Sequence, residues 1–183
     1  MKGLAAVLLA GALAGGCAES GGARPRSEYV TLRTGGWAQQ LALAKGGQII
    51  GPTIQLSPTD TGYRGIADSM MVDLRSDGER IVGTIHDQIV DLHVSVTDEG
   101  GLLARGLFAG RLGRLDASSE AIKSNLGICS YELEAKGTRY EGHRACRRAR
   151  IPMARPASVE LPSGFERLSL DRQAMLLAIL LTQ

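Results

Sequence analysis

Residues 129–146 read CSYELEAKGTRYEGHRAC, and this stretch decides the fold class. Gly137 and Thr138 lie at its midpoint, and a two-residue turn of type II′ favours glycine at its first position. A hairpin with this turn places Cys129 opposite Cys146 at a non-hydrogen-bonded pair, where opposed residues lie closer together. The sequence therefore predicts an antiparallel hairpin closed by a Cys129–Cys146 disulfide.

The two faces of this hairpin differ in polarity, as a half-buried pair of strands requires. The apolar face carries Tyr131, Leu133, Ala135 and Tyr140, and the polar face carries Ser130, Glu132, Glu134, Glu141 and His143. A redox-active pair would need the short CxxC-like spacing, which is absent. We therefore expect a structural disulfide, which fits an oxidising compartment.

Upstream, residues 70–96 predict two further hairpins with a shared inward face. Asp77-Gly78 is a strong hairpin signal, and a second tight turn is expected at Asp87-Gln88. The first turn pairs Leu74 with Ile81, Val72 with Gly83 and Met70 with Ile85, all facing the core. The second turn pairs Ile85 with Val90, Gly83 with Leu92 and Ile81 with Val94. The alternating pattern thus continues over three consecutive strands.

The rest of the chain adds shorter strands and two helices. Further strands are expected within residues 29–33, 41–45, 48–56, 63–67 and 102–112. A short helix capped by Asp116 is expected over residues 117–125, and an apolar helix follows Ser169 from Leu170 to about Leu181. The fold class is thus all-β: an antiparallel meander of about nine strands forming a sandwich or an up-and-down barrel. The C-terminal helix either packs on the β-domain or plugs a barrel end, or it contacts a partner or membrane surface.

The N-terminus has the pattern of an export signal. Lys2 precedes an uncharged run of about 11 residues, which is too short to span a bilayer. The run ends in Leu13-Ala14-Gly15-Gly16-Cys17, which resembles the lipobox of bacterial lipoproteins, although Ala14 stands where leucine is usual. The resemblance implies cleavage before Cys17 and lipidation of its sulfur and amine. Because Ala18 is not aspartate, it also implies the outer membrane. The alternative is an ordinary cleaved signal with an incidental cysteine.

These features divide the chain into four segments. They are the signal peptide (1–16), the lipidated cysteine and flexible tether (17–27), the antiparallel β-domain (28–150), and an extended segment with the C-terminal helix (151–183). The whole chain has 183 residues and a formal net charge of +2, which excludes a generic polyanion binder. Glycine occurs 24 times, about twice the average usage, which favours short strands and turns.

Catalytic and cofactor motifs are absent from the sequence. The segment His86–Asp91 invites interpretation as a metal or acid site, but the expected register separates His86 from His93 by about 13 Å. No phosphate-binding loop, dinucleotide fingerprint or nucleophile elbow occurs. We therefore expect no cofactor and no catalytic residue. The alternative is an envelope hydrolase or metal-dependent enzyme using acids near His86–Asp91.

An arginine cluster is the one polar feature that suggests a ligand. Arg144, Arg147, Arg148 and Arg150, with Arg155 nearby, suit contact with phosphate or carboxylate, although a solvated strand end would look the same. By elimination, the sequence predicts a lipid-anchored envelope protein that acts as a non-catalytic binding or assembly module. Its expected partners are the membrane and either an envelope protein or a small apolar ligand, with no role for nucleic acid.

Overall fold

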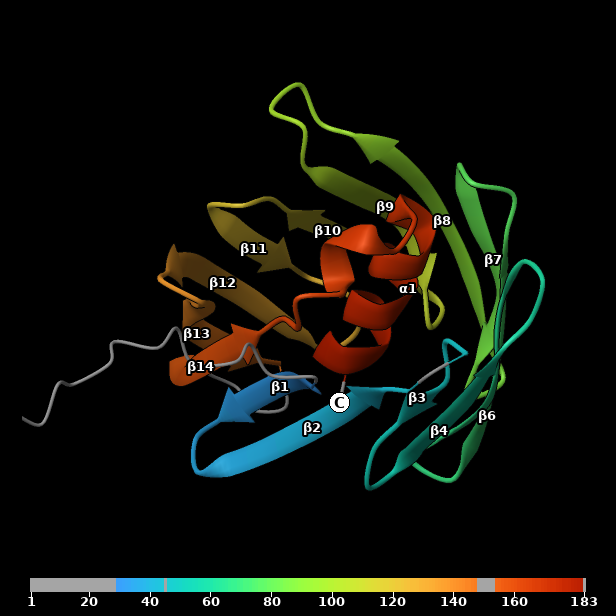
Figure 1. The fold of residues 1–183 in the computed structure, drawn as a ribbon, viewed down its shortest axis with the longest axis horizontal. Coiled ribbons are helices and arrows are strands. Elements are labelled where there is room, and N and C mark those ends of the chain that lie inside the picture. The colour runs from blue at the N-terminus through green and yellow to red at the C-terminus, as the bar shows by residue number, and fades with distance from the viewer. Residues whose placement is uncertain (1–28, 45, 148–153, 183) are drawn as a thin grey trace, which may run out of the picture.

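The computed structural model describes residues 29–44, 46–147 and 154–182, which form a closed antiparallel barrel with one α-helix. Each strand pairs with its neighbours in the chain, and the last strand pairs with the first. Figure 1 shows the helix α1 (Leu170–Leu181) in the middle of the ring of strands. The expectation of an antiparallel barrel with a C-terminal helix is therefore confirmed.

The described residues form fourteen strands rather than about nine. The first seven are β1 (Tyr29–Thr34), β2 (Trp37–Leu43), β3 (Ile49–Ile50), β4 (Ile54–Pro58), β5 (Gly62–Ala67), β6 (Met70–Ser76) and β7 (Arg80–Ile85). The others are β8 (Gln88–Val96), β9 (Leu102–Phe108), β10 (Arg111–Ala117), β11 (Ala121–Ser124), β12 (Cys129–Lys136), β13 (Arg139–Cys146) and β14 (Ala154–Glu160). A short 3-10 helix, η1 (Phe165–Arg167), leads into α1.

Hidden turns account for two of the missed strands, and a third, β14, lies in the segment predicted as extended beyond the β-domain but closes the barrel between β13 and β1. Residues 48–56 divide into β3 and β4, and residues 102–112 divide into β9 and β10 at Ala109-Gly110. Both turn residues there have positive φ, at 49° and 72°, although alanine rarely adopts this conformation. A turn that begins with alanine carries little sequence signal, so the break was not predicted.

The helix predicted over residues 117–125 is wrong, because this segment contains β11. The Ser118 hydroxyl accepts hydrogen bonds from the backbone N–H groups of Glu120 and Ala121, each at 3.2 Å. A side chain that satisfies local backbone donors in this way favours a turn over a helix. The chain then returns with Ile122 buried and Lys123 exposed, which is the alternation of a strand.

The two central hairpins have the predicted inward face but a different register. Ser76 pairs with Ile81, so the pairing is two residues away from the predicted one, and Met70 is exposed. The Asp77 carboxylate accepts the N–H groups of Glu79 and Arg80, which lengthens the loop. The next turn lies at His86-Asp87 rather than Asp87-Gln88, and both of its residues have positive φ. A shift of two residues keeps every side chain on its predicted face.

The hairpin predicted over residues 129–146 is confirmed in every pair. Lys136 pairs with Arg139 beside the turn, and Cys129 pairs with Cys146 at the other end. The two cysteines form a disulfide that closes a sequence separation of 17 residues. Tyr131 and Leu133 are buried, and Glu132 and Glu134 on the opposite face are exposed.

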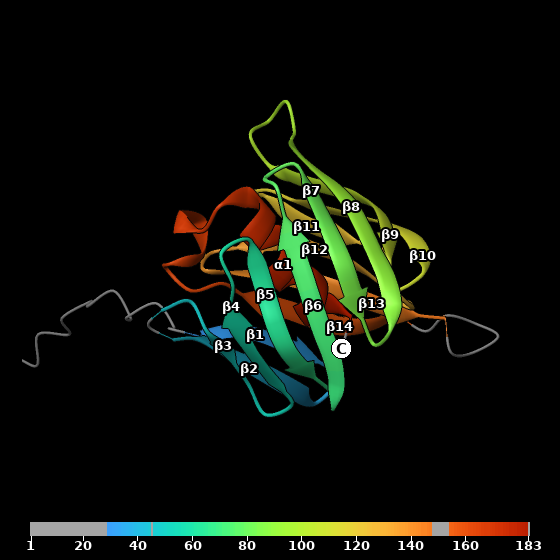
Figure 2. The same cartoon turned by 90° about the vertical axis from the view of Figure 1, so that its right-hand side faces the viewer.

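The barrel interior is filled by α1. Its residues Ala174–Leu181 are all buried, and inward side chains of the surrounding strands join the same core cluster. Figure 2 shows α1 behind the strands β5 and β6. Within the described ranges, no helix combines the length and the hydropathy needed to cross a bilayer.

Glycines allow neighbouring strands to approach around this helix. Gly83 has φ +146° and lies opposite the buried Leu74, and a Cβ at Gly83 would meet the Asp73 carbonyl oxygen at 1.9 Å. Gly106 repeats the arrangement opposite Leu92, with a Cβ 2.1 Å from the Asp91 carbonyl oxygen. Glycine within a strand commonly marks such a bend or close backbone approach.

The disulfide should contribute substantially to stability. A loop of this size is expected to add about 3 kcal/mol by restricting the unfolded chain. We therefore expect the Cys129→Ser/Cys146→Ser protein to lose about that much free energy of unfolding in urea titration. An unchanged free energy of unfolding would contradict the assignment of a stabilising role to this bond.

Candidate functional site

The two ends of the barrel are distinguished by their turns, because consecutive turns of an antiparallel meander alternate between ends. The described connections at the upper end are 59–61, 77–79, 97–101, 118–120 and 137–138, together with residues 44 and 46–48 between β2 and β3. Those at the lower end are 35–36, 51–53, 68–69, 86–87, 109–110 and 125–128, and β13 ends and β14 begins at this end as well. The helix α1 starts at the upper end, where Arg172 Nη2 donates to the Thr59 carbonyl at 3.2 Å, and it ends beside Gly127 at the lower end.

A pocket of about 410 Å³ lies at the upper end, where the chain turns into α1. Phe165 and Leu170 border it from the helical segment, and Leu102 and Ile122 border it from the barrel wall. Pockets that hold small ligands commonly have volumes of about 300 Å³ or more and combine apolar walls with a few polar groups. The upper pocket has this composition.

Tyr140 supplies one of the polar groups of the upper pocket. Its hydroxyl donates to the Ser118 carbonyl oxygen at 2.8 Å. Burial raises the pKa of Tyr140, and the negative charge of Glu166 raises it further. Tyr140 therefore remains neutral near pH 7 and presents an uncharged wall. Gln173, also at this pocket, donates to the Leu168 carbonyl at 2.8 Å.

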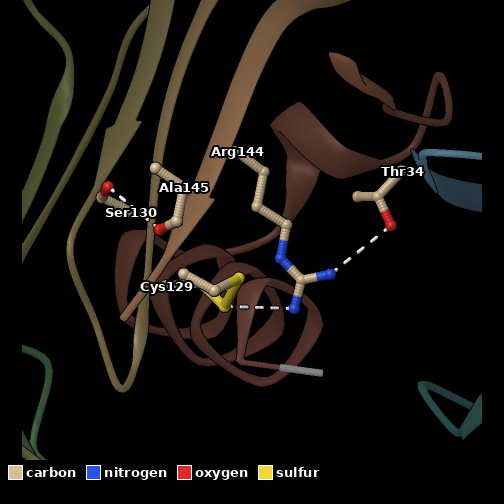
Figure 3. The surroundings of a disulfide bond; sticks show 6 residues. Thr34, Cys129, Ser130, Arg144 and Ala145 are labelled. Atoms are coloured by element: carbon tan, nitrogen blue, oxygen red, sulfur yellow. Dashed lines mark hydrogen bonds between the residues drawn. A yellow bond between two sulfur atoms is a disulfide. The ribbon is translucent and has the colours of Figure 1, made fainter. Parts of the chain in front are cut away.

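Arg144 and Arg147, the two described members of the predicted arginine cluster, do not lie on one surface. Arg144 points into the barrel, where its Nη2 donates to the Cys129 sulfur at 3.2 Å and its Nη1 donates to Thr34 at 3.4 Å (Figure 3). Arg147 is exposed at the lower end. Arg148 and Arg150 lie outside the described residues. The prediction that Arg144 shares an anion-binding surface with Arg147 is therefore not supported by the direction of its side chain.

Arg144 instead packs over an aromatic ring. Its guanidinium carbon lies 5.6 Å from the centre of the Tyr131 ring. Burial raises the pKa of Tyr131 to about 12, although the positive charge of Arg144 acts in the opposite direction. The Tyr131 hydroxyl has no hydrogen-bond partner among the described residues. The Arg144 guanidinium thus covers the buried Tyr131 ring beside the Cys129–Cys146 disulfide.

The His86 and Asp91 side chains of the segment His86–Asp91 do not converge on one site but contact separate partners. The imidazole Nε2 of His86 lies 3.0 Å from the Ala67 carbonyl oxygen. The Asp91 carboxylate accepts two hydrogen bonds from Arg80, at 2.7 and 2.6 Å, and these bonds lower the pKa of Asp91. His93 pairs with Arg80 across the strands. The predicted register, which pairs Ile81 with Val94 and Gly83 with Leu92, would place His93 opposite Val82 instead. The described residues contain no group of three or more acidic, histidine or cysteine side chains placed to hold a metal ion.

The lipidation site predicted at Cys17 lies outside the described residues. Comparison of the chain with protein-family models, curated proteins and solved structures finds no match. The functional interpretation therefore rests on the chain's own geometry.

Two features of the barrel ends were not predicted from the sequence. The upper pocket is bordered by residues from several segments that are far apart in the chain, between Gly100 and Gln173, so no single stretch of sequence indicates it. The other feature is Arg111, which lines a lower-end hollow together with Arg147. Recognising the turn at Ala109-Gly110 would have placed Arg111 at that end.

The buried tyrosine gives a pH-dependent prediction. Tyrosine in the unfolded chain titrates near pH 10, so a folded pKa of about 12 means that the unfolded state loses its proton first. The contribution of Tyr131 to the free energy of unfolding is therefore fully present below pH 10. It falls by about 1.4 kcal/mol per pH unit as the pH rises toward 12. Tyr131→Phe should flatten this slope in urea titrations at pH 9 to 12. An identical slope in both proteins would exclude Tyr131 as its source.

Proposed function

We propose that this protein is a bacterial envelope lipoprotein, anchored in the outer membrane through Cys17, whose barrel is a non-catalytic binding module. Its ligand is a small, predominantly apolar molecule held in the upper pocket. The observation that carries this proposal is a pocket of about 410 Å³ at the point where α1 enters the barrel, with apolar walls and a polar edge formed by Tyr140, Arg139 and Glu166.

The filled interior supports this choice of site. Because Ala174–Leu181 occupy the barrel core, a ligand has no room beside them without displacing the helix. The upper pocket lies outside this packed region and is lined partly by exposed residues such as Ala135 and Thr138. A ligand can therefore bind there while the core stays intact.

The anchor is supported by the sequence pattern and by the disulfide. A disulfide is typical of proteins exported to an oxidising compartment, and an exported lipoprotein meets such an environment. Several acyl chains on one cysteine provide stable membrane attachment at about 0.8 kcal/mol per buried methylene. Mass spectrometry of the native protein should show a chain that begins at Cys17 and carries acyl groups. A chain that retains residues 1–16 without modification would contradict the anchor.

Filling the upper pocket should block ligand binding. Ala135 is exposed and lines the pocket, so Ala135→Trp occupies it without removing a core side chain. Ala154→Trp is the matched control, because Ala154 is an exposed strand residue at the lower end. We expect at least tenfold weaker binding of an environment-sensitive fatty-acid probe to Ala135→Trp and unchanged binding to Ala154→Trp. Equal affinities in both variants would overturn the assignment of this pocket.

A further inference from the structure

Exposed apolar side chains are concentrated at the lower end of the barrel. Eleven large hydrophobic side chains are exposed among the described residues, and eight of them lie within two positions of a lower-end turn. We call these eight the lower rim: Trp37, Ile50, Ile66, Met70, Met71, Ile89, Leu107 and Leu112. An exposed set of this size, gathered at one end, marks a contact surface rather than scattered surface residues.

The strand register places six of these side chains on the outer wall, whereas Met70 and Trp37 share the inward face of their strands and are exposed because they lie at its lower edge. Ile66 pairs with Met71 next to one turn, and Leu107 pairs with Leu112 next to another. Between these pairs lies Ile89, with 61% of its surface exposed. This part of the lower rim therefore follows the barrel edge from the β5–β6 hairpin to the β9–β10 hairpin.

Charge is also divided between the two ends. The upper-end connections contain six acidic residues, Asp60, Asp77, Glu79, Asp98, Glu99 and Glu120. At the lower end, Arg33, Arg111, Arg147 and Arg155 are exposed. None of these four arginines belongs to an ion pair among the described residues, whereas Arg64, Arg80 and Arg114 on the barrel wall each pair with an aspartate. The lower-end connections also contain two exposed aspartates, Asp68 and Asp87, and neither forms an ion pair with these four arginines among the described residues. The exposed arginines at this end therefore outnumber the acids of its connections.

Two of these arginines border the same hollow. Arg111 and Arg147 line a lower-end recess of about 370 Å³, and the polar side chains of Asn125 and Ser130 line it as well. Leu112 also borders the recess and is 82% exposed. A recess with cationic sides beside a projecting aliphatic chain matches a phosphate group attached to hydrocarbon.

We propose that the lower end of the barrel rests on an anionic lipid bilayer, with a headgroup phosphate in the recess between Arg111 and Arg147. The lower rim then enters the boundary between headgroups and acyl chains, where aliphatic and tryptophan side chains are favourable. A bilayer surface presents anionic groups and accessible hydrocarbon over one broad plane. The lower end combines arginines with an arc of apolar side chains in the same way.

This proposal rests on the proposed function in one respect: the lipid anchor at Cys17 would bring the barrel close to a bilayer. The eleven residues between Cys17 and the start of β1, 18–28, can extend about 36 Å at about 3.3 Å per residue. A strand of seven residues, such as β6, rises about 23 Å. The tether can therefore reach from the start of β1 at the upper end to a membrane below the lower end.

The chain contains a natural probe for this orientation. Trp37 is its single tryptophan and belongs to the lower rim. We would reconstitute the mature lipidated chain in vesicles of phosphatidylglycerol and phosphatidylcholine with brominated acyl chains, and then measure Trp37 fluorescence. We expect quenching of at least half relative to non-brominated vesicles. In the control Trp37→Phe/Val96→Trp, the tryptophan lies near the upper end and should not be quenched.

The arginines are tested separately in the mature chain with Cys17→Ser, which removes the anchor. Basic residues at an anionic surface contribute about fivefold each to binding. Arg111→Gln/Arg147→Gln should therefore weaken binding to vesicles containing phosphatidylglycerol by about 25-fold. Arg64→Gln/Arg80→Gln is the matched control, because these arginines are paired on the barrel wall, and its binding should change less than threefold.

The outcomes separate this proposal from the proposed function. If the lipidated chain floats with vesicles but Trp37 is not quenched, or if the tryptophan at position 96 is quenched instead, the lower-end orientation is wrong. If the two double arginine variants bind equally, the headgroup site is wrong. If the lipidated chain does not float, the anchor itself fails. Unchanged urea midpoints for all variants establish that differences in binding do not come from unfolding.

Discussion

The packing of α1 inside the barrel is the constraint on which the remaining structure depends. A barrel of about eight strands can be filled by its own side chains, whereas wider barrels leave a lumen that must be occupied by something else. This chain closes fourteen strands and fills the interior with residues Ala174–Leu181, which are at most 1% exposed. Burial of each large aliphatic side chain contributes about 1.5–3 kcal/mol. The C-terminal helix α1, twelve residues long, thus completes a core that the strands cannot complete alone.

This constraint also directs function to the ends of the barrel. With the lumen occupied, the side wall carries ion pairs such as Arg80 with Asp91, which satisfy their own charges. The upper end retains a pocket with apolar walls and a polar edge, and the lower end retains the lower rim and four arginines that form no ion pair within the described part of the chain. The two proposals therefore assign different ligands to opposite ends: a small apolar molecule above and a lipid surface below.

Short-range signals predicted the parts of the fold in which turn chemistry is explicit. The hairpin from Cys129 to Cys146 was predicted in full, because Gly137-Thr138 fixes the turn and the disulfide fixes its far end. The inward face of β6 to β8 was also predicted, since a register shift of two residues does not change which side chains face inward. The turn at Ala109-Gly110 and the serine-directed turn before β11 lack a strong signature, so strands were merged or read as a helix. Without these turns the strands could not be counted correctly. The width of the barrel, and therefore the need for a helix to fill it, could not be predicted either.

The candidate site was predicted less completely than the fold, for a physical reason. Arg144 and Arg147 are three residues apart, but strand alternation and the chain's exit from β13 send them to different places: Arg144 into the core and Arg147 to the surface. The partner of Arg147 in the lower-end recess is Arg111, which is remote in sequence. Sequence proximity therefore grouped arginines that the barrel separates, and it missed the pair that the barrel brings together.

The most direct test of the filled-barrel account is equilibrium urea unfolding, followed by near-ultraviolet circular dichroism, of the mature chain with and without residues 170–183. The account predicts a cooperative transition for the full chain and its loss in the shortened chain, with recovery when a peptide of residues 170–183 is added. A shortened chain that unfolds cooperatively at the same urea midpoint would contradict the claim that α1 completes the core.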